Sequence, residues 1–277
     1  MESTFWERVA AEGQPPSGYP LGELTTELTT MLGDTDPHRR DGIACELLGA
    51  WVADGVYDDL LEGLGDGMAT GLLVGLGENG TDTVFRRSFS ALVLSACIAR
   101  DNAARLMPGE TVLGWGDRLA GWLLREQDLR GYVVGKGWAH AVAHGADGLG
   151  ELAGSTAFGA PELAVLLDVL ADRLIAPTDH RFVHGEDDRL ARAAMQVLRR
   201  DGMPLEAVER WLDRLADAAV LVDEPGSDPY RVAGNVRGFL KALHLQLALS
   251  SRPPACRADL LLTLIGHLKR LDEPLLG

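Results

Sequence analysis

The sequence has few basic residues for its size: 26 Lys and Arg stand against 41 Asp and Glu, and the net charge of the 277 residues is -15. Nucleic acids and anionic membrane surfaces are bound through concentrated positive charge. The charge balance therefore argues against both as partners. It still allows a small anionic ligand that is held by a local group of Lys and Arg side chains.

Cysteine is scarce and long apolar runs are missing. Cys45, Cys97 and Cys256 lie far apart in helical apolar patterns and form neither a disulfide framework nor a CxxC metal motif. No apolar stretch reaches the roughly 18 residues of a membrane span. The start MESTFWERVAAEG also lacks the basic and apolar regions of a signal peptide. We therefore expect a cytoplasmic protein with buried free thiols; the sequence leaves its oligomeric state open.

Strand signals are missing too, because no segment alternates apolar and polar residues at period two for long enough. Apolar residues recur instead with a period near 3.6, and Gly, Pro and Asp separate these segments. The pattern predicts an all-α protein. The expected helices are near 21–32, 38–54, 57–75, 82–100, 109–126, 136–153, 160–175, 187–200, 204–220, 229–249 and 255–272.

Helices joined by short turns normally pack antiparallel against their neighbours. Here successive helix pairs follow one another at steps of roughly 40 to 55 residues, close to the period of HEAT repeats. The sequence therefore predicts a HEAT/armadillo-like curved α-solenoid of antiparallel helix pairs. No long linker divides the chain, so we expect one domain over 1–277, with 1–20 as an N-terminal extension.

The segment GYVVGKGWAHAVAHGADGLG contains four ionisable residues spaced four, four and three apart. They are Lys136, His140, His144 and Asp147. If 136–153 is a helix, these side chains share one face, because residues three and four apart are neighbours on a helix. Ionisable groups along a face rich in Ala and Gly suggest the lining of a pocket, with Trp138 as a further wall.

In a solenoid, one helix of each pair lines the concave surface, where ligands usually bind. If 136–153 is such a helix, polar residues of neighbouring helices should reach that surface too. We expect ligand-binding side chains at Arg86, Arg87, Glu186, Asp187, Arg189 and Asn235. Together with Lys136, the Arg residues could hold a carboxylate or phosphate through charge-assisted hydrogen bonds.

Three interpretations remain open for the face formed by Lys136, His140, His144 and Asp147. In the first, it binds a small anionic or zwitterionic ligand, and one histidine, oriented by Asp147, also moves a proton near neutral pH. In the second, the chain is a divalent-metal hydrolase whose ligands are His140, His144 and Asp147. Lys136 and the missing Glu of an HExxH motif argue against a metal, so we expect no cofactor. In the third, both histidines form structural interhelical hydrogen bonds.

A non-catalytic scaffold for a peptide or protein is the alternative function, since HEAT-like arrays commonly serve in this way. The sequence thus leaves open whether the protein is an enzyme.

Five segments together resemble one protein family. They are RRDGIACELLGAWVADG (39–55), VFRRSFSALVL (84–94), RGYVVGKGWAHAVAHGAD (130–147), GEDDRLARA (185–193) and NVRGFLKALH (235–244). In this order they resemble the helical, mostly bacterial family known as domain of unknown function 2785. The resemblance implies an all-helical, HEAT-like fold and suggests that the five segments contribute to one site. It implies no activity and no catalytic residue.

Overall fold

The protein is all-α, as the apolar periodicity predicts. The computed structural model describes residues 3–221 and 228–276, and 70% of the structure is helical. Within those residues the strands are confined to one short hairpin. The chain forms two compact units, residues 1–148 and 149–277, and the boundary between them lies inside helix α7.

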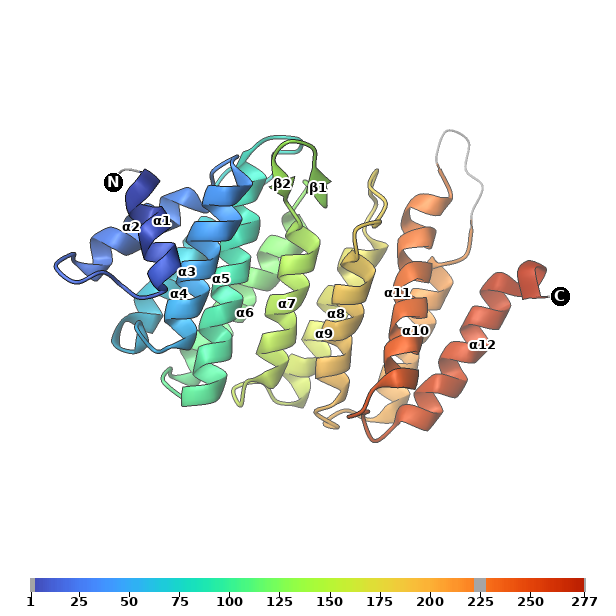
Figure 1. Ribbon diagram of the computed structural model, residues 1–277. Coiled ribbons are helices and arrows are strands. Elements are labelled where there is room, and N and C mark those ends of the chain that lie inside the picture. Colours follow the sequence, from blue (N-terminus) through green and yellow to red (C-terminus); the bar gives the residue numbers. More distant parts are fainter. Residues whose placement is uncertain (1–2, 222–227, 277) are drawn as a thin grey trace. The chain divides into compact units, whose positions relative to one another are not determined.

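The first unit contains most of the short elements (Figure 1). In chain order they are α1 (Ser3–Glu12), α2 (Leu21–Met31), the π-helical η1 (His38–Cys45), α3 (Glu46–Ala53), the 3₁₀ turn η2 (Asp58–Leu60), α4 (Leu61–Gly71), α5 (Thr83–Ala104), α6 (Gly109–Arg125), β1 (Tyr132–Val133), β2 (Gly137–Trp138) and the first half of α7 (Ala141–Gly154).

Helix α5 lies at the centre of the first unit and packs against η1, α3, α4 and α6. It is buried on most of its circumference, so its sequence is apolar or small at most positions. The contact between α4 and α6 depends on Gly65, because a Cβ there would lie 2.2 Å from the ring of Trp115. Small residues thus allow large aromatic side chains to fill the core.

Residues 1–20, predicted as an extension, contain a helix that packs on the first unit. Helix α1 contacts η1, and the indole of Trp6 donates to Glu27 Oε2 at 3.0 Å. Trp6 and Val9 are buried. This N-terminal helix therefore contributes apolar side chains to the core of the unit.

The second unit is built from longer helices in two layers. They are α8 (Ala160–Ile175), α9 (Glu186–Leu198), α10 (Leu205–Ala218), α11 (Tyr230–Leu249) and α12 (Arg257–Leu276), preceded by the second half of α7. Helix α10 packs against both α8 and α12, and α11 packs against α9. Trp211 joins the layers, because its indole donates to Leu167 O at 2.8 Å and its ring meets Phe239 edge to face.

The predicted helix over 136–153 was wrong at its N-terminal end. Residues 132–138 form the β1–β2 hairpin instead, and α7 begins only at Ala141. Gly135 and Gly137 both have positive φ, at 78° and 80°, which glycine adopts without steric cost and a right-handed helix does not contain. The other helices lie close to their predicted positions.

The three cysteines are free thiols, as predicted, but only one is fully buried. Cys97 is completely shielded, and burial raises its pKa to about 12. Cys45 and Cys256 are partly exposed. The prediction of burial therefore holds in full for Cys97 alone.

Candidate functional site

The β1–β2 hairpin places Trp138 against His140. Tyr132 pairs with Trp138 and Val133 with Gly137, so residues 134–136 form the turn. Beyond β2, His140 N donates to Arg130 O at 3.1 Å, which continues the extended pairing to the start of α7. Side chains two apart in an extended segment lie on the same side. The rings of Trp138 and His140 accordingly stack, with centroids 4.3 Å apart and planes 18° apart.

An aromatic row runs from this hairpin into the core of the first unit. Tyr132 meets the edge of Trp138 at 4.9 Å, and His140 meets His144 at 5.9 Å. His144 in turn packs edge to face against Phe89 of α5, with centroids 5.1 Å apart. The row begins at side chains that are 48% and 39% exposed, Tyr132 and Trp138, and ends at the buried His144.

The position of the proton on His144 follows from its partner. Its Nδ1 lies 3.1 Å from the carbonyl oxygen of Ser88, which is buried in α5. A carbonyl oxygen only accepts, so Nδ1 is the donor, and the neutral ring carries its lone pair on Nε2. His144 is therefore fixed in both orientation and tautomer.

Arg40 of η1 holds the turn of the hairpin by a hydrogen bond to its backbone. Its guanidinium is fully buried and lies over the rings of Phe85 and Phe89 at 4.2 and 4.9 Å. It donates to Lys136 O at 2.8 Å, and its Nε pairs with Asp41 at 2.7 Å. Burial lowers the pKa of Arg40 and raises that of Asp41, while the mutual attraction opposes both shifts.

Lys136 lies in the hairpin turn, so the prediction that it shares a helix face with the two histidines was wrong. Its Nζ donates to both carboxylate oxygens of Asp82, at 2.6 and 2.8 Å, and both side chains are partly exposed. The base of the hairpin is tied to the same loop by Arg130, which donates to Asp128 and to Thr81 O. Two cationic side chains, Lys136 and Arg130, and two anionic ones, Asp82 and Asp128, therefore lie at the hairpin and its base.

The predicted ligand-binding residue Arg87 forms a buried structural clamp. It donates to both carboxylate oxygens of Glu126, at 2.6 and 2.8 Å, and both side chains are fully buried. Its Nη1 also donates to Val74 O, Gly75 O and Thr83 Oγ1. A role in ligand binding stays a prediction that these contacts do not favour.

Arg86, one residue earlier, crosses the gap between the ends of two helices. A Cβ at Gly33, beyond the end of α2, would lie 3.3 Å from Arg86 Cβ, and one at Gly71, the end of α4, would lie 3.1 Å from its Nε. Partial burial lowers the pKa of this guanidinium. The carboxyl ends of helices carry partial negative charge, which favours a cation there. Among the described residues, however, the buried Nε of Arg86 has no hydrogen-bond partner.

Asp147 lies three residues after His144 in α7 and is partly exposed. The small residues around it serve helix packing. A Cβ at Gly145 would lie 2.8 Å from a methyl group of Leu123, and one at Gly148 would lie 2.5 Å from Leu119. Much of the small-residue surface of α7 is therefore covered by α6, where the sequence suggested a pocket.

The remaining predicted residues belong to the second unit, near the contact of α9 with α11. Glu186, the first residue of α9, is buried and accepts from His184 N at 2.9 Å. Asn235 of α11 accepts from Phe182 N at 2.9 Å and donates to His180 O at 3.0 Å. Both side chains thus hold the loop before α9 in place.

Asp187 and Arg189 follow on α9. A Cβ at Gly238 of α11 would lie 2.8 Å from Asp187 Oδ2, so this carboxylate lies against the neighbouring helix. Burial first, and then the charge of Arg192, lower the pKa of Arg189. The contribution of this second-unit group to one site with the hairpin residues stays a prediction.

A metal site at His140, His144 and Asp147 lacks geometric support. In residues 3–221 and 228–276, no three or more His, Cys, Asp or Glu side chains are grouped so that they could hold a metal ion.

Also within those ranges, no helix is sufficiently long and apolar to cross a membrane.

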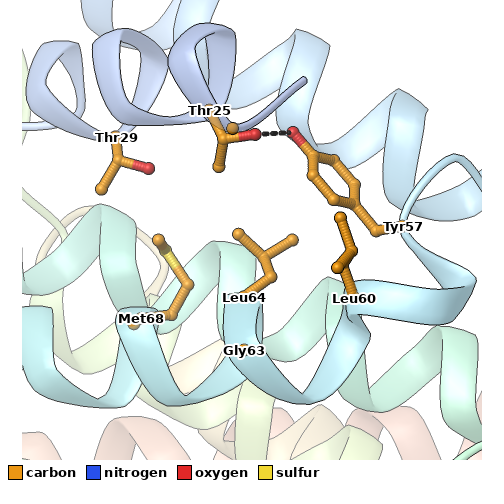
Figure 2. Close-up of a pocket in the computed structure, with 9 residues that line it drawn as sticks. Thr25, Thr29, Tyr57, Leu60, Gly63, Leu64 and Met68 are labelled. Carbon is orange, nitrogen blue, oxygen red and sulfur yellow. Dashed lines mark hydrogen bonds between the residues drawn. The ribbon is translucent and has the colours of Figure 1, made fainter. Parts of the chain in front are cut away.

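Sequence reasoning missed a groove between α2 and α4 (Figure 2). Its volume is about 300 Å³. The sequence does contain a pattern that indicates such a groove. Gly63 and Gly67 repeat one turn apart on α4, and Thr25 and Thr29 do so on α2. Small residues at this spacing on two facing helices leave a gap that larger side chains would fill.

The fold and these contacts define an all-α protein whose first unit presents a short aromatic hairpin ahead of a histidine-containing helix. A family profile matches residues 72–245, more than half of the chain, and its description is "Protein of unknown function (DUF2785)". The chain belongs to this family, which confirms the resemblance of its sequence segments. Neither curated proteins nor solved structures gave a match.

Proposed function

We propose that the first unit binds a small zwitterionic molecule at the hairpin, on the surface formed by Lys136, Asp82, Trp138 and His140. The observation that carries the proposal is the stacked pair of Trp138 and His140, in which the Trp138 side chain is 39% exposed. A partly exposed aromatic ring that already packs against another ring is a suitable platform for a ligand, because ordering it further costs little conformational entropy.

The charges beside the platform favour a ligand with both signs. A simple anion would be attracted by Lys136 but repelled by Asp82, which lies 2.6 Å from the same ammonium group. A zwitterion can place its carboxylate near Lys136 and its cationic group near Asp82. The face of Trp138 adds favourable cation–π energy for that cationic group.

Acid–base chemistry at this surface would fall to His140. It is partly exposed, whereas His144 is buried behind it and fixed by Ser88. His140 also has a positive φ of 50°, and residues in such sparsely populated conformations often cluster at functional sites. The proposal therefore assigns contact with the ligand to His140 and support to His144.

Calorimetry with matched probes tests the binding. Trimethylglycine offers both charges, acetate only the negative one and tetramethylammonium only the positive one. We expect trimethylglycine to bind most tightly, and Trp138→Ala or His140→Ala to weaken it about tenfold or more. Tyr19→Ala is the matched control, because Tyr19 is an equally exposed aromatic side chain of the first unit. Equal binding by wild type and both hairpin variants would overturn the proposal.

A peptide-binding scaffold is the second candidate, and a separate observation favours it. Three apolar side chains of the hairpin are exposed, with Val134 at 90%. The others are Tyr132 and Trp138. Exposed apolar groups on one short element commonly mark a surface that a partner covers. Fluorescence polarisation with a labelled peptide library would then give hits that Val134→Asp abolishes, whereas trimethylglycine binding would not change in this variant.

We also propose that the helix pairs continue as a HEAT-like solenoid. The packing inside the second unit supports this, since α8, α10 and α12 follow one another in one layer and α9 and α11 in the other. A compact globule of this chain length has a radius of gyration of about 19 Å. Small-angle X-ray scattering should give a clearly larger value for a solenoid, and a value near that of the globule would contradict it.

A cytoplasmic location completes the proposal. Its support is the presence of three cysteines that are all free, as is usual in a reducing compartment. Fractionation of cells that express the tagged protein checks it, and recovery in a membrane or extracellular fraction would exclude it.

A further inference from the structure

The groove between α2 and α4 is a second candidate binding site, separate from the hairpin. Figure 2 shows Thr25 and Thr29 of α2 facing Leu64 and Met68 of α4 across the gap, with Tyr57 at one end. The lining consists of Gly22, Thr25, Thr29, Tyr57, Leu60, Gly63, Leu64, Gly67 and Met68. The volume of about 300 Å³ lies at the lower end of the range for small-molecule sites.

The groove exists because glycines stand where side chains would fill it. A Cβ at Gly22, Gly63 or Gly67 would meet no other atom within 4 Å. Leu64 and Met68 on the same helix are buried and form an apolar floor. Helices that present small residues to each other over two turns leave room that their neighbours do not occupy.

The hydrogen bonds at the Tyr57 end fix which group a ligand must bring. Thr25 Oγ1 donates to Leu21 O at 2.7 Å and lies 2.8 Å from the hydroxyl of Tyr57. The single hydroxyl hydrogen of Thr25 is used by the carbonyl, so Tyr57 must be the donor of the second bond. The Tyr57 oxygen is then left with acceptor capacity only, and a ligand there must donate.

The lining carries no charged side chain, so a charged ligand would lose hydration without gaining an ionic partner. Burial of Tyr57 raises its pKa to about 12, which keeps its hydroxyl neutral at physiological pH. Thr29 offers a second hydroxyl at the end of the groove opposite Tyr57. The chemistry of the walls therefore matches a neutral molecule with an apolar body and few polar atoms.

We propose that this groove binds a small neutral alcohol or phenol whose hydroxyl donates to Tyr57 Oη while its hydrocarbon part lies between Gly63, Gly67 and Met68. The volume suits a compound of about ten non-hydrogen atoms, since one water occupies about 30 Å³. This site does not depend on the hairpin surface, which lies on other elements of the first unit.

An NMR titration of the full chain with three probes tests the inference. The probes are 4-ethylphenol, which donates a hydrogen bond, 4-ethylanisole, which cannot, and 4-ethylbenzoate, which is charged. We expect saturable shifts of amides in α2 and α4, with the phenol bound about fivefold more tightly than the ether. Absence of these shifts, or equal or tighter binding of the ether or the benzoate, would overturn the proposal.

Two variants test the apolar part of the groove and its polar end separately. Gly67→Leu should fill the groove and abolish binding, whereas Gly266→Leu, at an exposed helical glycine with equally open surroundings, should not affect it. Tyr57→Phe keeps the ring but removes the acceptor, so the phenol should lose its advantage over the ether. Phenol binding as in wild type by a folded Gly67→Leu variant, or an unchanged preference in Tyr57→Phe, would exclude this site.

Discussion

His144 donates from Nδ1 to the carbonyl oxygen of Ser88 at 3.1 Å, and this bond joins α7 to the N-terminal third of α5. Residue 88 lies inside a long helix, so its carbonyl is an unusual partner for a side chain from another helix. The bond fixes the second ring of the His140–His144 pair and thereby supports the Trp138 platform in front of it.

The first prediction concerns this bond. His144→Ala removes the donor and leaves a cavity beside Phe89, so it should lower the free energy of unfolding by about 1–3 kcal/mol. His140→Ala, at a partly exposed position, should cost less. Urea denaturation measures both changes. A His144→Ala variant as stable as wild type would show that the bond contributes nothing.

The second prediction concerns the buried pair of Arg87 and Glu126. Removing either partner leaves a buried charge without compensation, so Arg87→Ala and Glu126→Ala should each lower the free energy of unfolding by about 3–5 kcal/mol. The double change Arg87→Ala with Glu126→Ala should cost less than the sum of the two single losses, because neither buried charge then remains. Denaturant unfolding of the four proteins completes the cycle. Additive losses in the double variant would show that the two side chains do not stabilise each other.

A third prediction compares the two hairpin glycines. Both have a φ near +80°, so alanine at either position should cost about 1–2 kcal/mol from the backbone alone. A Cβ at Gly137 would also lie 2.9 Å from Pro37 Cβ and 3.0 Å from Arg40 Nη2, whereas a Cβ at Gly135 would meet nothing within 4 Å. Gly137→Ala should therefore lower the melting temperature more than Gly135→Ala. The reverse order would be incompatible with the close packing of Gly137.

The fourth prediction concerns pH. His38 Nε2 lies 2.8 Å from the carboxylate of Glu7, and this hydrogen bond raises the pKa of His38 above 6.5. A raised pKa in the folded state means that the pair stabilises the protein below the unfolded pKa and loses this contribution as pH rises through the folded value. NMR titration should give a His38 pKa above 6.5 that returns toward 6.5 in Glu7→Gln. An unchanged pKa in that variant would exclude Glu7 as the cause.

Most of the fold could be predicted from the sequence, because the period of the apolar residues directly reflects which face of a helix is buried. The exception is the segment around Lys136, which forms a hairpin and not a helix. Lys136, His140 and His144 have helical spacing, and this spacing outweighed the two glycines at 135 and 137 in the sequence-based interpretation. In the structure the glycines determine the local conformation, since their positive φ values end any helix there.

The site was predictable only in part. The contact between His140 and His144 was expected from their spacing, and it persists although His140 precedes the helix. The role of Arg87 could not be foreseen, because Glu126 is 39 residues away in sequence and only the packing of α5 with α6 brings them together. The groove lined by Thr25 and Gly67 likewise depends on the distance between two helices, which no local pattern specifies.

The most direct test of zwitterion binding at the hairpin is an NMR titration that follows the indole N–H of Trp138 in the intact chain. On addition of trimethylglycine, we expect a saturable shift of this resonance, a smaller shift with acetate or tetramethylammonium, and loss of the effect in Lys136→Met. A Trp138 indole that stays unchanged up to saturating trimethylglycine, or that responds equally in Lys136→Met, would contradict binding at the hairpin.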